Sequence, residues 1–289
     1  MKTQESGNTL SARAGSTALL NDTPARDYAL KLRRFNAFAE PEIRGAMQAL
    51  GLAQGMHILD VGCGSGEALR WLHELVTGSG LVAGIDLASA HVAAARATSP
   101  LDILVAQADL LRPPFSAALF DLIWCVNTIG HLRRPEEGLA VLRSLTRSGG
   151  RIALGQSSFL PDMFLAWNAR LERVLTEAVR RFYRDRYEIS ESDTAQIRGL
   201  IGLLKRGGLH QVTARTFIIE RVFPLRPIDE GYLTEVIFGE MRGERLRPYL
   251  SDQDFVELTR LSDRGHPDYA LRRQDFHFLQ TFSLVTGVV

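Results

Sequence analysis

The chain has 289 residues, of which 45% are hydrophobic and 23% charged, and its formal net charge is +1. A chain of this length and apolar content can bury a sizeable core, which excludes a disordered protein. The near-neutral charge gives no electrostatic footprint for nucleic acid, so we expect no nucleic-acid partner. The sequence has no run of about 18 apolar residues, so we also expect no membrane span.

The N-terminal residues 1–23 are polar and lack the apolar centre of a signal peptide, so we expect a disordered leader. Cys63 and Cys125 are the only cysteines. Two cysteines make no disulfide framework, and we expect small, buried, reduced thiols in a cytoplasmic protein. Lysine occurs only at Lys2, Lys31 and Lys205, so nearly all the positive charge is arginine, a bias that we take to indicate a bacterial source.

Apolar residues recur at helical spacing in Asp27–Phe38 and again in Pro41–Leu50, where the second segment starts at a proline. This pattern predicts helical structure in both segments. Together they would form an N-terminal helical cap over residues 24–50, ahead of a main domain over residues 51–289.

The segment His57–Arg70 reads HILDVGCGSGEALR. Its apolar start predicts a buried strand, and Gly62, Gly64 and Gly66 follow immediately before a predicted helix. Glycines permit positive φ angles and let backbone N–H groups approach a ligand, next to the positive end of the helix. The segment therefore predicts a cofactor-binding turn between a strand and a helix.

The spacing of the glycines decides between cofactors. A nicotinamide-binding turn places its third glycine at position 67, where this chain has Glu67. A second predicted strand, Leu81–Ile85, ends in Asp86, whose carboxylate can accept from two hydroxyl groups at once. The glycine spacing therefore argues against a dinucleotide cofactor.

Three further strands are predicted in order, at Ile103–Ala106, Phe120–Asn127 and Arg151–Leu154, with a helix at Pro135–Thr146 before the last of them. Asp109 follows the first of these strands. Asn127 and Thr128 lie at the end of the second.

The run from Asp60 to Gly66, with the ordered acids after it, resembles motif I of the class I S-adenosylmethionine-dependent methyltransferases, in particular those of bacterial natural-product pathways. The resemblance covers residues 57–154 and implies an α/β, Rossmann-like, seven-stranded sheet with helices on both faces. It implies S-adenosyl-L-methionine as the cofactor, with Asp86 on the ribose hydroxyls and Asp109 on the adenine amino group. The full implied cofactor set is Asp60, Gly62, Cys63, Gly64, Gly66, Asp86, Leu87, Ala108, Asp109, Leu110, Asn127, Thr128 and Arg33. In many relatives an N-terminal helix covers the cofactor, which would place Tyr28 over the methyl group and Arg33 or Arg34 near the carboxylate.

The remaining chain is expected to add helical lid insertions at about 157–190 and 224–278. Pro161–Tyr187 has an apolar stripe on an arginine-rich helix, and three interpretations compete: a packed lid, a dimer interface and a membrane-surface helix. Residues 224–278 would be a second part of the lid or an oligomerisation arm. After the first insertion we predict a helix at Ser192–Arg206 and strands at Val212–Val222 and Thr281–Gly287. Within the second insertion we predict lid helices near Asp229–Met241 and Ser251–Ser262.

The chemistry follows from the implied cofactor, whose methyl group is already activated, so that alignment and exclusion of water come first. His131, just beyond the fourth strand, is the candidate general base, and the alternative is a packed or helix-capping histidine. We predict methyl transfer to a small-molecule acceptor, through O, N or C, with an aromatic or lipophilic specialised metabolite expected and no metal. A homodimer is one expected assembly. The alternatives are a protein or RNA methyltransferase and a cofactor-binding protein without catalysis.

Overall fold

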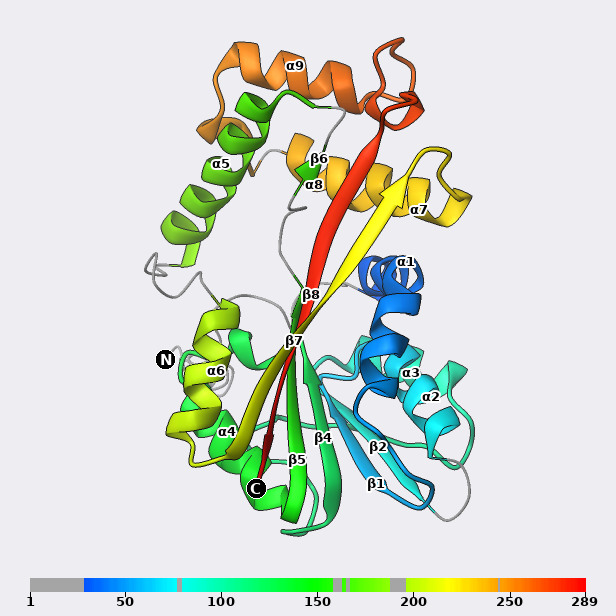
Figure 1. Cartoon of the computed structure of the whole chain (residues 1–289), viewed down its shortest axis with the longest axis vertical. Helices are drawn as coiled ribbons and strands as arrows, with labels where there is room; N and C mark the ends of the chain where they lie inside the picture. Colours follow the sequence, from blue (N-terminus) through cyan, green and yellow to red (C-terminus); the bar gives the residue numbers. More distant parts are fainter. Residues whose placement is uncertain (1–28, 77–79, 158–162, 165–166, 188–195, 244) are drawn as a thin grey trace, which may run out of the picture.

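The structure is a computed structural model that describes residues 29–76, 80–157, 163–164, 167–187, 196–243 and 245–289. The molecule is elongated and has two lobes (Figure 1). A lower lobe contains the parallel strands and the helices that flank them. An upper lobe contains helices that lie around the far ends of two long strands, β7 and β8, which run through both lobes.

The sheet has the strand order β3-β2-β1-β4-β5-β8-β6, and β7 pairs with the other edge of β8. Strands β3 to β5 along this path are parallel, and β8 is antiparallel to β5, β6 and β7. The seven-stranded Rossmann-like sheet is therefore confirmed, with the two-residue β6 added to it. The strands are β1 His57–Val61, β2 Leu81–Asp86, β3 Leu104–Gln107, β4 Phe120–Val126, β5 Thr146–Ser157, β6 Met163–Phe164, β7 His210–Val222 and β8 His277–Val288.

Helices cover both faces of the lower part of the sheet (Figure 1). On one face lie α1 Ala29–Gln48, α2 Glu67–Leu75 and α3 Ser89–Thr98, and on the other lie α4 Pro135–Leu145 and α6 Gln196–Arg206. Each face has its own apolar core, and the strands supply alternate side chains to the two. This arrangement explains the near-continuous apolar runs of the parallel strands, which are buried on both sides.

The N-terminal cap is one helix, which includes both of the segments that the sequence indicated. Helix α1 continues through Pro41. Phe38 before the proline and Ile43 and Met47 after it are all buried in the same core. Burial of both halves outweighs the one intrahelical hydrogen bond that a proline removes, and the proline ring itself lies at the exposed side.

The upper lobe is helical, as predicted for the two insertions. Its elements are α5 Ala169–Tyr187, α7 Pro227–Tyr232, a π-helical turn Leu233–Phe238, α8 Gly239–Arg242 and α9 Asp252–Ser262, with short 3-10 turns at Arg247–Tyr249 and Ala270–Arg272. The apolar stripe of α5, which includes Leu171 and Leu175, is buried within this lobe. A packed helix is thus the interpretation that the structure supports, because the stripe is not free to meet a membrane surface. No described helix is long and apolar enough to cross a bilayer.

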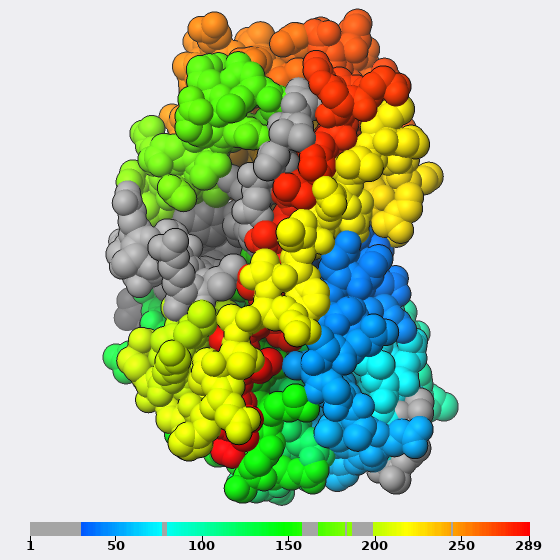
Figure 2. Space-filling view, viewed as in Figure 1, coloured from blue at the N-terminus to red at the C-terminus, as the bar shows by residue number. Residues whose placement is uncertain are grey.

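Strand β7 lies between α1 and β8 on the visible face, where its yellow surface separates the blue and red ones (Figure 2). It contacts α1 on one side and pairs with β8 along 11 residue pairs. Strand β7 therefore connects, together with β8, the core of the lower lobe with the helices above it.

Candidate active site

The glycine loop between β1 and α2 adopts a conformation that side chains would prevent. Gly62, Gly64 and Gly66 have φ angles of 77°, 53° and 88°. A Cβ atom on Gly62 would lie 2.1 Å from Oγ1 of Thr128, and one on Gly66 would lie 3.0 Å from the backbone of Ala95. The loop therefore requires glycine for both its backbone angles and its close neighbours.

Asp86 lies at the end of β2, directly beside this loop. One of its carboxylate oxygens accepts from the N–H of Gly64 at 2.9 Å, and the other accepts from the N–H of Ala88 at 2.9 Å and lies 3.2 Å from Nδ1 of His91. The side chain is 12% exposed. A carboxylate has about four acceptor positions, so Asp86 keeps capacity for a ligand hydroxyl.

Asp60 is a buried acid at the end of β1, with 2% exposure. Its Oδ2 atom is buried and has no hydrogen-bond partner among the described residues. Burial raises the pKa of Asp60 well above its usual range, and the nearby charges of Asp86 and Glu67 raise it further. A buried acceptor of this kind fits a donor or a positive charge that a ligand brings.

Asp60, Glu67 and Asp86 place three carboxyl groups around the loop, and the charges of Glu67 and Asp86 oppose ionisation of Asp60. This arrangement disfavours the diphosphate of a dinucleotide, because like charges would meet at short range. It favours a cofactor that carries positive charge. Within the described residues, no group of His, Cys, Asp and Glu is arranged to hold a metal ion.

Glu67, which occupies the third-glycine position of a nicotinamide-binding turn, links the glycine loop to helix α1. Its Oε2 accepts from Oγ of Ser65 at 2.7 Å and from Nδ2 of Asn36 at 2.9 Å. A Cβ on Gly64 would lie 3.1 Å from Leu32, which comes from the same helix, α1, as Asn36. Helix α1 therefore covers the loop, and the hydrogen bond between Asn36 and Glu67 holds it there.

The fourth strand ends in a strained and well-bonded turn. Asn127 has a φ of 52°, an uncommon angle for a residue with a side chain. Its Oδ1 accepts from the N–H of Ser157 at 2.8 Å and its Nδ2 donates to Oγ of Ser157 at 3.2 Å. This pair ties the end of β4 to the end of β5, beside the glycine loop that Thr128 contacts.

His131 follows on a 3-10 turn, Ile129–His131, whose last N–H donates to the carbonyl of Thr128 at 2.9 Å. Burial lowers the pKa of His131 below its usual 6.5, although a hydrogen bond to the backbone of Asn127 opposes that shift. The imidazole is therefore neutral at pH 7, the state that a general base needs.

The segment after β3 lies beside the end of β2, because the N–H of Ala108 donates to the carbonyl of Asp86 at 3.0 Å. Asp109 is exposed, and its Oδ1 accepts from the N–H of Leu111 at 2.9 Å. Leu110 is buried, and Leu87 is 38% exposed. The structure thus brings the predicted adenine and ribose acids to one edge of the sheet.

The remaining predicted residues are two arginines, a tyrosine and the two cysteines. Arg33 is exposed on α1, whereas Arg34 forms an ion pair with Glu235 of the upper lobe. Tyr28 lies outside the described residues. Cys63 and Cys125 are free and buried, and burial raises the pKa of both thiols, to about 12 for Cys125, so both are protonated at pH 7.

A comparison with protein families finds that residues 58–150 match a methyltransferase domain. The matched segment runs from β1 into β5, so it contains Asp60, Glu67, Asp86 and Asp109. The chain carries a class I S-adenosylmethionine-dependent methyltransferase domain.

Curated relatives of this methyltransferase domain include 27-O-demethylrifamycin SV methyltransferase of Amycolatopsis mediterranei. It is 29% identical over 119 residues, which cover 39% of this chain and 43% of that protein. The O-methyltransferase cnsE of Penicillium expansum is 31% identical over 110 residues, covering 36% and 39%. The matches thus span about two fifths of these relatives.

Among solved structures, the YcgJ protein of Bacillus subtilis is similar with a TM-score of 0.54 and 15% identity. The match covers 85% of this chain and 97% of that protein. This likeness establishes the shared fold.

Proposed function

We propose that this protein transfers the methyl group of S-adenosyl-L-methionine to a small-molecule acceptor. The observation that carries the proposal is the buried Oδ2 of Asp60, which has no hydrogen-bond partner among the described residues and lies beside the charges of Glu67 and Asp86 at the glycine loop. A cofactor with an ammonium and a sulfonium group matches these charges, and a dinucleotide does not.

The residues at the sheet edge fit the parts of this cofactor. Asp86 would accept from the ribose hydroxyls, and Asp109 from the adenine amino group. The N–H groups of the glycine loop and the acceptor of Asp60 would face the methionine part. When bound, the cofactor supplies a methyl group on a sulfonium, which is ready for displacement.

The acceptor atom that we propose is a hydroxyl oxygen. His131 is neutral because burial lowers its pKa, and it lies beyond the end of β4 on the same edge of the sheet as the loop. It would take the proton of the acceptor hydroxyl as the oxygen attacks the methyl carbon. Two relatives are named for O-methylation, which supports oxygen over nitrogen or carbon.

The upper lobe would cover the acceptor and exclude water. Trp167 and Phe238, whose ring centroids lie 5.6 Å apart, are buried in the apolar core of this lobe and would keep it packed as a cover. A specialised metabolite made in a bacterial cytoplasm is the acceptor class that we propose.

The test uses S-adenosylmethionine with a labelled methyl group and a panel of phenols, alcohols, amines and carboxylic acids. We expect label on a hydroxyl-bearing small molecule, and we expect a His131→Ala protein to lose most of that transfer. Transfer to a protein or RNA fraction instead would favour a macromolecular methyltransferase. Cofactor binding without transfer to any acceptor would favour a non-catalytic role.

A further inference from the structure

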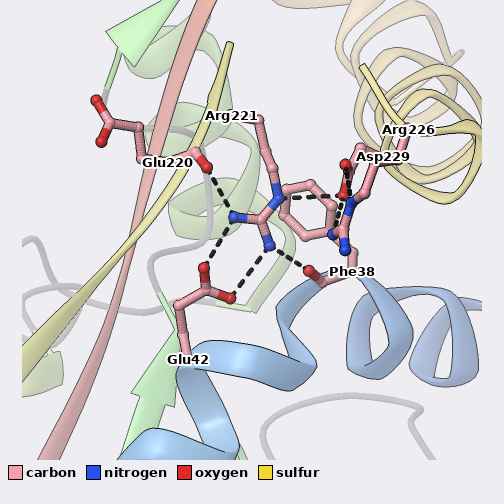
Figure 3. Close-up of polar contacts among 6 residues, drawn as sticks. All are labelled: Phe38, Glu42, Glu220, Arg221, Arg226 and Asp229. Atoms are coloured by element: carbon pink, nitrogen blue, oxygen red, sulfur yellow. Dashed lines mark hydrogen bonds and ion pairs between the residues drawn. The ribbon is translucent and has the colours of Figure 1, made fainter. Parts of the chain in front are cut away.

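Arg221 of β7 lies at the junction of the two lobes and uses all three of its guanidinium nitrogens (Figure 3). Nη1 and Nη2 donate to the two carboxylate oxygens of Glu42 on α1, at 2.8 and 3.1 Å. Nε donates to Oδ1 of Asp229 on α7 at 3.1 Å. The Arg221 side chain is only 10% exposed, so these bonds are little screened by water.

The same guanidinium also donates a hydrogen bond to the backbone of α1, at the bend near Pro41. Its Nη2 donates to the backbone carbonyl of Phe38, and its Cζ lies 4.6 Å from the centroid of the Phe38 ring. Phe38 lies three residues before Pro41, which has no N–H to donate to the carbonyl of Ala37, so Arg221 bonds the carbonyl next to the one that the proline leaves without its helical donor. Arg221 thus supplies a donor to a backbone carbonyl at the bend.

The charges in this cluster balance. Arg221 and Arg226 face Glu42 and Asp229, and Arg226 donates to both oxygens of Asp229 at 2.7 and 2.8 Å. Burial alone would raise the pKa of Asp229, but the bonds from the two arginines outweigh burial and hold it below its usual value. The cluster therefore stays ionised, and it fixes α1, β7 and α7 relative to one another.

Two residues before Phe38, the same helix holds the glycine loop. Asn36 donates to Glu67, which accepts from Ser65 within the loop. The hydrogen-bonded path thus runs from α7 through Arg221 to the bend of α1, and from there through Asn36 and Glu67 to the loop. Every step on this path is a contact between described residues.

We propose that Arg221 is a positioning residue: it holds the bend of α1 so that Asn36 keeps the glycine loop in its binding conformation. Arg221 does not touch the loop and acts through the helix. The effect on cofactor affinity rests on the proposed function, whereas the effect on the free loop does not.

The test compares Arg221→Gln with the wild-type chain by amide hydrogen exchange of residues 62–67 and by calorimetric titration of S-adenosylhomocysteine. Gln cannot bond Glu42, Asp229 and the Phe38 carbonyl together, so we expect faster exchange in the free loop. We expect the affinity to fall about tenfold, a usual size for coupling between separated sites.

Arg170→Gln is the matched control. Arg170 bonds Asp254 at 2.5 Å and Glu257 at 2.9 Å, which joins α5 to α9 inside the upper lobe. It is expected to leave both the loop exchange and the affinity within about twofold of wild type, in the range of a distant surface substitution. An equal effect of Arg170→Gln would overturn the proposal, because any loosening of the upper lobe would then be enough to speed loop exchange and weaken binding.

A double substitution tests the route through α1. If Arg221 acts through Asn36, then Asn36→Ala combined with Arg221→Gln should weaken binding little more than the stronger single change, because coupled sites are not additive. Additive losses would contradict the route. If Arg221→Gln fails to fold, Glu42→Gln is used in its place. This change weakens the two bonds between α1 and Arg221, and the same measurements are compared.

The two failures are distinguishable. A wild-type chain that does not bind S-adenosylhomocysteine would overturn the proposed function, and loop exchange in the free protein would still decide the role of Arg221. Wild-type loop exchange in a folded Arg221→Gln protein would overturn the role of Arg221 alone.

Discussion

The two lobes are specified by the sequence in different ways. The lower lobe contains the matched family segment, residues 58–150, and its binding residues sit within a few positions of strand ends. The upper lobe is assembled from 169–187 and 227–272, which are distant in the sequence and meet through apolar packing and ion pairs. The difference teaches that short motifs determine the proposed cofactor site, whereas long-range packing determines the lobe that we propose to cover the acceptor.

Helix α1 belongs to both lobes. It contacts α2 and α3 below and α7 above, and Phe38 stacks on Tyr232 with centroids 4.3 Å apart. If the lobes have separate tasks, changes in the lower lobe should alter chemistry and cofactor binding. Changes in the upper lobe should alter stability first.

The largest effect is expected at the chemical step. His131→Ala should lower the single-turnover rate about 10²- to 10⁴-fold and leave cofactor affinity nearly intact. Because burial lowers the pKa of His131, the wild-type rate should be full at neutral pH and fall only as the pH drops through a value below 6.5. The variant should lack this acid limb. A variant with the wild-type rate and pH profile would remove His131 from the chemistry.

The next effect is expected in the glycine loop. Gly62→Ala should weaken S-adenosylhomocysteine binding by about 10- to 100-fold, because a Cβ there meets Thr128 at 2.1 Å and φ is 77°. Gly51→Ala is the control, since Gly51 also has a positive φ of 61° but nothing within 4 Å of its Cβ position. Equal losses of affinity in the two variants would show that backbone strain alone, and not the fit against Thr128, matters.

A smaller effect is expected at the lobe junction. Asp229→Asn should lower the free energy of unfolding at pH 7 by about 1–3 kcal/mol, because it weakens charge-assisted bonds in a side chain that is 3% exposed. The folded pKa of Asp229 is depressed, so its contribution is present above its unfolded pKa and is lost as pH falls through the lower folded value. Chemical denaturation at several pH values between 2 and 7 measures both.

The exposed pair of Arg273 and Asp275 provides the control for that comparison. Asp275 also has a depressed pKa, from its hydrogen bond to Arg273, but its side chain is 62% exposed. Asp275→Asn should leave the denaturation midpoint nearly unchanged, as is usual for surface pairs. If both variants change the free energy of unfolding by the same amount, the ion pairs at the lobe junction contribute no more to stability than a surface pair does.

Much of the fold could be predicted because it follows from local patterns. The parallel strands, the positive-φ glycines and the helices of the insertions all follow from apolar periodicity and turn residues. The continuity of α1 through Pro41 could not be predicted, since it depends on burial on both sides of the proline and on a donor from Arg221, 180 residues further along the chain.

The site shows the same division. Asp60, Asp86 and Asp109 were predictable from strand ends, whereas Asn36 and Glu67 were missed because their bond joins two elements 31 positions apart. The sequence showed Glu67 only as the residue at the third-glycine position of a nicotinamide-binding turn, and this did not indicate its contact with α1. Arg33 was chosen by analogy from a pair of arginines, and nothing local indicated that its neighbour Arg34 would face Glu235.

Calorimetric titration of S-adenosylhomocysteine into the wild-type chain and into Asp86→Ala tests the central claim, that the lower lobe binds this cofactor through its acids. Asp86 touches the loop at Gly64 and keeps acceptor capacity for the ribose. We expect wild-type binding and a loss of about tenfold or more in the folded variant, the size expected for charge-assisted hydrogen bonds. Unchanged affinity in Asp86→Ala, or tight binding of NAD in place of S-adenosylhomocysteine, would contradict the account.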